Sequence, residues 1–188
     1  MNKIFQAAAE LQDVCQSQGW QFCFIGGLAL QRWSEPRETV DVDLSLLAGF
    51  GQEQLFSNVL LKHFEPRISN AADFARERRV LLLRSSEGVG LDVALAALPY
   101  EELLIQRSSY FDYSPRISLR TCSAEDLIVL KAFAGRGQDW ADVERVIVRQ
   151  TDKLDWDYIY EQLRPLAQLK DAPEIVDQLE ARRAEFEC

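Results

Sequence analysis

The sequence predicts an α+β protein, in which an α/β unit of about 120 residues precedes a helical unit. Polar and apolar residues alternate strictly over residues 39–46, as they do in a half-buried strand. Residues 78–98 contain two apolar runs joined by a Ser/Gly-rich turn, which predicts two more strands. From Ser123 onward the apolar spacing becomes helical. We therefore expect one domain over residues 1–121 and a second over residues 122–188.

The expected elements follow the chain in order. The first segment places apolar side chains on one helical face and ends at Gly19, and the next is a short buried strand. Gly26 and Gly27 break that strand before one or two helical turns. Ser123 and Asp126 are spaced as an N-terminal helix cap. The expected ranges are a helix over 2–18, a strand over 21–25, helical turns over 28–33, a loop over 34–38, a strand over 39–46, a helix over 51–64, two strands within 78–98, a short strand near 117, and helices over 123–134, 139–149, 155–169 and 172–186.

The composition narrows the class of protein. Hydrophobic residues make up 47% of the 188 residues, which predicts a folded core. The net charge of −9 disfavours a generic nucleic-acid binder, which would be basic. No apolar run approaches the roughly 20 residues of a membrane span. With no signal peptide expected, we predict a cytoplasmic protein with reduced thiols, and the absence of CxxC pairs argues against structural zinc. The four cysteines are Cys15, Cys23, Cys122 and Cys188.

Two aspartates on one strand raise the possibility of a metal site. Asp41 and Asp43 point to the same side of the predicted strand, roughly 6–7 Å apart along the backbone. Carboxylates at that spacing repel each other. A bound Mg²⁺ (or Mn²⁺) removes the repulsion, because such ions take hard oxygen ligands. Asp92, which interrupts a later apolar strand, would add a third carboxylate. Three carboxylates can hold two metal ions about 4 Å apart for in-line phosphoryl or nucleotidyl displacement.

Gly26 and Gly27 precede this strand and suit a phosphate site. Glycine lets the backbone approach a phosphate closely. A helix that opens at Leu28 would also favour anions at its N-terminus. Other interpretations remain open: the glycines could serve only a tight turn, and the aspartates could be solvent-facing or structural.

The spacing of these residues resembles that of a known family. A GG pair followed by R-x-T-x-D-x-D, here "RETVDVD", is similar to the polymerase-β-like nucleotidyltransferase superfamily. The segment "SAEDLIVLKAFAGRGQDWADV" resembles the AbiEii-type branch, whose members carry a helical Lys, then Ala, Arg and Asp-x-x-Asp. The positions that match this second pattern are Lys131, Ala134, Arg136, Asp139 and Asp142.

The resemblance implies a fold, an activity and roles for residues. It implies a mixed β-sheet flanked by helices and followed by a C-terminal helical region. It also implies transfer of an NMP from an NTP to an acceptor, with Mg²⁺ or Mn²⁺ as cofactor. Asp92 would help deprotonate the acceptor hydroxyl, and Lys131 would offset the triphosphate charge. The implied metal ligands are Asp41, Asp43 and Asp92, and the implied nucleotide-binding residues are Gly26, Gly27, Arg37, Thr39, Lys131 and Asp139.

The sequence leaves several alternatives open. The acceptor could be a tRNA end, a protein hydroxyl or a small molecule, and the chain could be the toxin of a toxin–antitoxin pair. A non-catalytic protein of the same fold, which acts by binding a partner such as an antitoxin, is the main alternative. A Mg²⁺ phosphohydrolase is a third. Lys131 could instead extend along an apolar surface, and Arg136 with Asp139 could form an ion pair of small worth.

Overall fold

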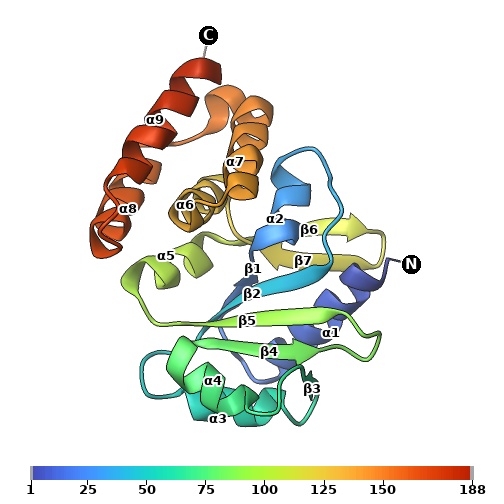
Figure 1. The fold of residues 1–188 in the computed structure, drawn as a ribbon. Helices are drawn as coiled ribbons and strands as arrows, with labels where there is room; N and C mark the ends of the chain where they lie inside the picture. Colours follow the sequence, from blue (N-terminus) through green and yellow to red (C-terminus); the bar gives the residue numbers. More distant parts are fainter. Residues whose placement is uncertain (1, 187–188) are drawn as a thin grey trace. The chain divides into compact units, whose positions relative to one another are not determined.

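The computed structural model describes residues 2–186 (Figure 1). In this part of the chain, helices and strands are interspersed up to Thr121, and only helices follow. The helices are α1 Lys3–Ser17, α2 Gly26–Trp33, α3 Glu53–Leu60, α4 Ala71–Arg78, α5 Pro99–Arg107, α6 Ala124–Ala134, α7 Gly137–Gln150, the 3₁₀ turn Thr151–Lys153, α8 Trp156–Leu169 and α9 Glu174–Phe186. The strands are β1 Phe22–Phe24, β2 Asp41–Leu47, β3 Glu65–Pro66, β4 Val80–Arg84, β5 Gly90–Ala96, β6 Ser109–Ser114 and β7 Ile117–Thr121.

The chain forms two compact units. The first contains the described residues up to Leu28 together with Glu38–Cys122. The second contains Ala29–Arg37 and the described residues from Ser123 on. A short segment that lies early in the sequence thus belongs to the second unit. The sequence predicts a domain boundary between residues 121 and 122, and that boundary stays a prediction.

The first unit is built on one mixed seven-stranded sheet, in the order β3-β4-β5-β2-β1-β7-β6. β2 runs parallel to β5, and β1 runs parallel to β7. The other neighbouring strands pair in antiparallel fashion. The mixed sheet and the helices around it confirm the predicted α+β class.

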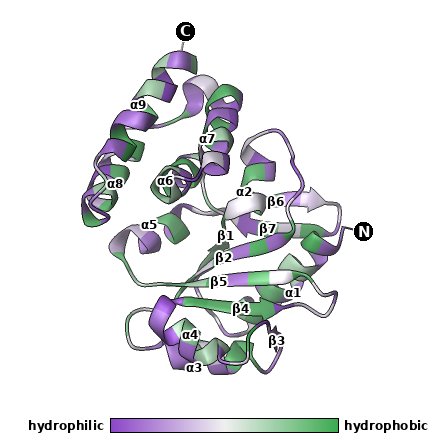
Figure 2. Cartoon of the chain, in the orientation of Figure 1, coloured by the Kyte–Doolittle hydropathy of each residue, from purple (hydrophilic) through white to green (hydrophobic). Residues whose placement is uncertain are grey.

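Buried hydrophobic residues line one face of this sheet, and the hydropathy colouring of Figure 2 marks hydrophobic positions along β4 and β5. In β5, Leu91, Val93 and Leu95 are buried in the main core. They join apolar residues of α1, α3 and α4, such as Leu11 and Leu60. Because side chains alternate along a strand, the residues between them face the other side of the sheet. The predicted polar positions lie on that second face.

Local sequence signals account for the starts of three helices, α1, α5 and α6. The Asn2 side chain caps α1 by accepting from the Ile4 amide at 3.0 Å. Ser123 caps α6 by accepting from the Asp126 amide at 3.1 Å, which confirms the predicted cap. Glu101 accepts from two backbone amides at the start of α5, so it closes a cap that the sequence reading did not identify.

Several predicted boundaries were wrong by two residues or more, among them the starts of α2 and β2. The helix expected at 28–33 begins at Gly26, because Gly26 adopts a positive φ of 56° that turns the chain directly from β1 into α2. The strand expected from Thr39 begins at Asp41. The hydroxyl of Thr39 donates to the Asp41 carbonyl at 3.0 Å, so Thr39 ends the loop instead of pairing in the sheet.

The second unit is helical. α6, α7, α8 and α9 pack together around buried aliphatic residues such as Leu127, Ile147, Ile159 and Leu179. Within residues 2–186, no helix combines the length and the apolar character needed to cross a bilayer.

The cysteines within residues 2–186 are all buried thiols: Cys15, Cys23 and Cys122. Burial raises the pKa of the Cys15 thiol to about 12. The prediction of a reduced thiol at Cys188 lies outside the described residues.

Candidate functional site

The register of two parallel strands brings three carboxylates to one face of the sheet. Asp43 of β2 pairs with Asp92 of β5, and Asp41 pairs with Gly90. Asp41, Asp43 and Asp92 are each half-buried, whereas the residues between them in β2 and β5 are fully buried. The sequence prediction that these three residues share a face therefore agrees with the strand register. We call this surface the carboxylate face.

The paired glycines lie directly against this face. A β-carbon at Gly26 would stand 2.1 Å from Oδ2 of Asp43, so no larger residue fits there without displacing the carboxylate. A β-carbon at Gly27 would stand 2.3 Å from the hydroxyl of Thr39. The Ile25 amide also donates to the Asp43 carbonyl at 3.0 Å. The first turn of α2 is thereby fixed beside β2.

The donor chemistry of the carboxylate face suits a hard divalent cation, since Mg²⁺ prefers carboxylate oxygens. Gly26 leaves the space beside Asp43 free of any side chain of its own. Among the residues that the structure describes, however, no three His, Cys, Asp or Glu side chains are gathered closely enough to form a metal-holding group. Instead, Arg67 donates a hydrogen bond to Asp92. The residues thus fit a cation by type and by face, and Arg67 contacts one of them.

Asp92 has a perturbed pKa. Burial is the largest cause and raises the pKa of its carboxyl group. The positive charge of Arg67 lowers it, and the negative charge of Asp41 raises it again, so the net shift is upward. The negative charge of Asp41 therefore acts on the carboxyl group of Asp92 from the same face of the sheet.

A second group of charged residues lies in the helical unit. Arg37 makes a bidentate ion pair with Asp142, with Nε to Oδ1 at 3.0 Å and Nη2 to Oδ2 at 2.9 Å. Lys131 Nζ lies 2.9 Å from Oδ2 of Asp142 and 2.9 Å from Oδ1 of Asp139. Arg136 Nε donates to Oδ2 of Asp139 at 2.6 Å. We call these five residues the ion-pair network.

The ion-pair network keeps two buried carboxylates charged. Asp139 and Asp142 have exposed fractions of 1% and 0%. Burial acts to raise both pKa values, but hydrogen bonds outweigh it and lower them: those of Arg136 and Lys131 act on Asp139, and those of Arg37 and Lys131 act on Asp142. A charge-assisted network of this kind fixes its members in one geometry.

Lys131 retains one donor beyond this network. An ammonium group carries three N–H donors, and the described residues supply two acceptors, Asp139 and Asp142. The side chain of Lys131 is 11% exposed. It is therefore oriented by two carboxylates and can still donate to an outside oxygen. Its alternative role, as a chain that merely covers apolar surface, does not account for these two ion pairs.

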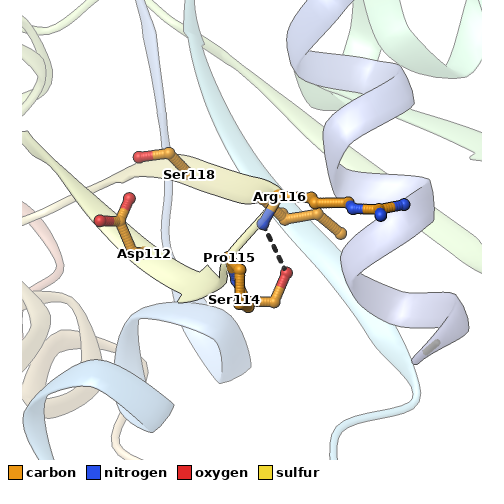
Figure 3. A pocket seen from close by; sticks show the side chains of 6 residues that line it. Asp112, Ser114, Pro115, Arg116 and Ser118 are labelled. Atoms are coloured by element: carbon orange, nitrogen blue, oxygen red, sulfur yellow. Dashed lines mark hydrogen bonds between the residues drawn. The ribbon is translucent and has the colours of Figure 1, made fainter.

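A pocket of about 570 Å³ lies elsewhere on the first unit, at the turn between β6 and β7 (Figure 3). Its lining includes Asp112, Arg116 and Ser118, and Ser114 accepts from the Arg116 amide there. None of the residues predicted from the sequence to be functional lines it. We therefore do not regard it as the functional site.

Three residues of these groups escaped the sequence reading. Arg67 follows a two-residue strand in a loop, where no pattern points to a contact with Asp92. Gly90 opposes Asp41, and only the register of β2 against β5 reveals it. Asp142 was noted as part of Asp-x-x-Asp but given no role. Asp142 follows Asp139 by three residues, which places both on one helix face. This spacing is the sequence signal that points to a shared role for the two aspartates.

Comparison with known proteins defines the class. A crystal structure of an antigenic nucleotidyltransferase-like protein from Paracoccidioides brasiliensis superposes with a TM-score of 0.51 at 17% identity, over 95% of this chain and 92% of that one. Lincosamide antibiotic adenylyltransferase LnuA, solved with lincomycin bound, gives a TM-score of 0.51 at 12% identity, over 75% of this chain and 94% of that one. At these identities the likeness shows a shared nucleotidyltransferase fold. None of the curated proteins compared with the chain matches it.

The family follows from the sequence itself. The model of the family described as "Nucleotidyl transferase AbiEii toxin, Type IV TA system" matches residues 11–186. The chain therefore belongs to the AbiEii family of nucleotidyltransferases, which confirms the resemblance noted from its motifs.

Proposed function

We propose that this protein is a divalent-metal-dependent enzyme that transfers the NMP group of an NTP to a hydroxyl group of an acceptor. One observation carries the proposal: Gly26 lies against Asp43, while the register of β2 and β5 sets Asp92 beside it on the same face. A glycine turn that a phosphate can approach, next to carboxylates on one face of a sheet, suits nucleotidyl transfer. Membership of the AbiEii family supports the same reaction class.

In this proposal Asp41, Asp43 and Asp92 hold Mg²⁺ or Mn²⁺. When bound, the cation neutralises phosphate charge and stabilises the charge that develops during transfer. The acceptor oxygen attacks the α-phosphorus of the NTP, the bond from that phosphorus to its bridging oxygen breaks, and pyrophosphate leaves. Asp92 takes the proton of the acceptor hydroxyl. Positioning and electrostatic stabilisation supply most of the rate.

The remaining residues bind and orient the nucleotide. The backbone of Gly26 and Gly27 approaches the β- and γ-phosphates, which only glycine permits beside Asp43 and Thr39. Lys131 directs its remaining N–H to a phosphate oxygen as pyrophosphate departs, and Asp139 holds the ammonium group for this role. Thr39 orients the first residue of β2 through its hydrogen bond to the Asp41 carbonyl.

Arg37, which the resemblance places among the nucleotide-binding residues, acts through a different route in this proposal. Arg37 donates two hydrogen bonds to Asp142, which also binds Lys131. It therefore supports the nucleotide site by orienting the ion-pair network.

We further propose a toxin-like role in the cytoplasm, with an antitoxin protein as partner. The description of the AbiEii family as toxins of type IV toxin–antitoxin systems supports this role. The candidate acceptors are a tRNA end, a protein hydroxyl and a small molecule. All three present a hydroxyl nucleophile, so the same residues serve each of them.

The test is a labelling experiment. The purified protein is incubated with Mg²⁺, each α-³²P-labelled NTP in turn and a cell extract, and the labelled product is separated into RNA, protein and small molecules. The double variant Asp41→Asn/Asp43→Asn removes two charges without changing side-chain size. Asp112→Asn removes a carboxylate from the exposed edge strand β6 of the same sheet and is the matched control.

We expect the native protein and Asp112→Asn to transfer label and release pyrophosphate, and the double variant to transfer none. Equal labelling by the double variant would show that the carboxylate face takes no part in the reaction. Release of free phosphate without a labelled acceptor would instead make the protein a phosphohydrolase. A native protein that labels nothing and shows no nucleotide-dependent rise in its unfolding temperature would be a non-catalytic binder.

A further inference from the structure

Arg67 reaches from the loop after β3 to the carboxylate face. Its backbone amide donates to the Leu82 carbonyl at 3.0 Å, which fixes the start of the side chain against β4. Its Nη2 donates to Oδ1 of Asp92. Its Nη1 lies 2.9 Å from the point where a β-carbon of Gly90 would stand, and Oδ1 of Asp41 lies 2.7 Å from the same point. The guanidinium group therefore lies beside two of the three carboxylates.

The absence of a side chain at residue 90 makes this position possible. A β-carbon there would collide with both Arg67 and Asp41, and glycine leaves the space to the two charged groups. The Arg67 side chain is 24% exposed. Its Nε is buried and has no hydrogen-bond partner in the part of the chain that the structure describes. Leaving a buried donor unsatisfied is costly, so the attraction of the carboxylates must outweigh that cost.

A divalent cation and this guanidinium group compete for the same oxygen atoms. The Asp92 oxygen that accepts from Arg67 is one of the oxygens a cation would bind. Two positive groups within a few ångströms of each other also repel strongly where burial lowers the effective dielectric constant. In the structure this oxygen of Asp92 is directed to Arg67.

We propose that Arg67 is an internal counter-ion of the carboxylate face, which binds Asp92 in the metal-free protein and releases it when a divalent cation binds. The inference rests on the proposed function, because it requires that the carboxylate face takes such a cation. Arg67 is a positioning residue in this scheme and does not ligate the metal. Its charge sets how tightly the metal binds and stabilises the sheet when the metal is absent.

The experiment measures metal affinity directly. Free Mn²⁺ is counted by electron paramagnetic resonance during titration of the native protein, Arg67→Gln, Arg67→Lys and Arg78→Gln, without nucleotide. Arg78 is an exposed residue of α4 in the same unit, so Arg78→Gln removes the same charge away from Asp92. We expect Arg67→Gln to bind Mn²⁺ on the order of tenfold more tightly, because a repelling and competing cation is gone. Arg67→Lys and Arg78→Gln should remain near the native affinity.

Thermal unfolding of the same proteins gives an independent readout. Without metal, Arg67→Gln should unfold at a lower temperature than the native protein, because its carboxylates have lost their counter-ion. Saturating Mn²⁺ should raise its midpoint by more than it raises the native midpoint. A merely structural role for Arg67 would lower stability without strengthening Mn²⁺ binding.

A measurement on the native protein covers the case in which Arg67→Gln does not fold. The ¹⁵N–¹H signal of the Arg67 Nε–H, assigned by its loss in Arg67→Lys, should move as Mg²⁺ is added. An unmoved signal at Mg²⁺ saturation would overturn the proposal, as would equal or weaker Mn²⁺ binding by Arg67→Gln. In both cases the metal still binds and the proposed function stands. If the native protein and every variant bind no Mn²⁺, the proposed function itself fails.

Discussion

Gly26 lies so close to Asp43 that a β-carbon at residue 26 would stand 2.1 Å from the carboxylate oxygen, 2.7 Å from Cγ and 2.9 Å from Cβ. The whole side chain of Asp43 would have to move to admit even a methyl group. The first turn of α2 and the third residue of β2, Asp43, are therefore in direct contact, so a change in one of them should displace the other.

The first prediction concerns Gly26→Ala. Gly26 has a φ of 56°, so alanine adds left-handed backbone strain as well as the collision with Asp43. We expect a loss of more than the roughly 1–2 kcal/mol that such strain costs alone, together with at least tenfold weaker Mn²⁺ binding. Urea unfolding and Mn²⁺ titration measure the two effects.

Gly19→Ala is the matched control for this change. Gly19 has a φ of 68° in the same unit, and its added β-carbon meets nothing within 4 Å. Gly19→Ala should lower the free energy of unfolding through backbone strain and leave the affinity for Mn²⁺ unchanged. Equal effects of the two variants on Mn²⁺ binding would mean that Gly26 has no special relation to the carboxylate face.

The second prediction concerns Lys131→Gln. The variant removes the charge that we propose to offset the triphosphate. We expect kcat/KM for the NTP to fall by about a hundredfold, as for the loss of a transition-state electrostatic contact. Steady-state assays of pyrophosphate release measure it. Lys153→Gln, at an exposed position in the same unit, should leave kcat/KM unchanged. Native kinetics in Lys131→Gln would reduce Lys131 to a structural member of the ion-pair network.

The third prediction concerns Asp142→Asn. The amide nitrogen of asparagine would face donors from Arg37 and Lys131 in the place of Oδ2. In the place of Oδ1 it would face donors from Arg37, Gln138 and Arg145. Removing one partner from a buried ion pair costs about 3 kcal/mol. Urea unfolding should show that loss, while Asp152→Asn, at an exposed position, should show almost none. A loss below 1 kcal/mol would contradict a central role for Asp142.

The fourth prediction concerns acid pH. Hydrogen bonds outweigh burial and lower the pKa values of Asp139 and Asp142 in the folded state. As the pH falls, the unfolded chain takes up protons first, so the stability these groups contribute is present above the ordinary aspartate range and is lost below it. The stability gap between the native protein and Asp142→Asn should therefore narrow between about pH 6 and pH 3. A constant gap in urea unfolding over that range would show that Asp142 has an ordinary pKa.

The sequence was sufficient for the parts of the fold that local patterns specify. The alternation around Asp43 predicted β2 and its polar face, and the Ser123 cap predicted the start of α6. The two glycines before the D-x-D strand predicted a close backbone approach to a phosphate, which stays a prediction, whereas the contact of Gly26 with Asp43 came from the structure. In each case the signal lies within a few residues and follows from backbone geometry.

The parts that escaped prediction depend on contacts between distant segments. Arg67 lies 25 residues before Asp92, and its contact depends on how β3, β4 and β5 pair. Gly90 gains its importance only from its register against Asp41. Helix α4 has an Ala- and Arg-rich sequence that shows little apolar periodicity, so packing against β4 and α3 specifies it rather than its own pattern.

The exchange of segments between the two units has a consequence for the gene. The peptide chain crosses from one unit to the other three times, after Leu28, after Arg37 and after Cys122. In a fragment that stops at Cys122, Arg37 would lack its ion pair with Asp142. The Trp33 carbonyl would also lack the hydrogen bond that the Gln150 side-chain amide donates to it at 2.8 Å. We therefore expect a gene truncated after Cys122 to yield a chain whose segment Ala29–Arg37 lacks the rest of its unit.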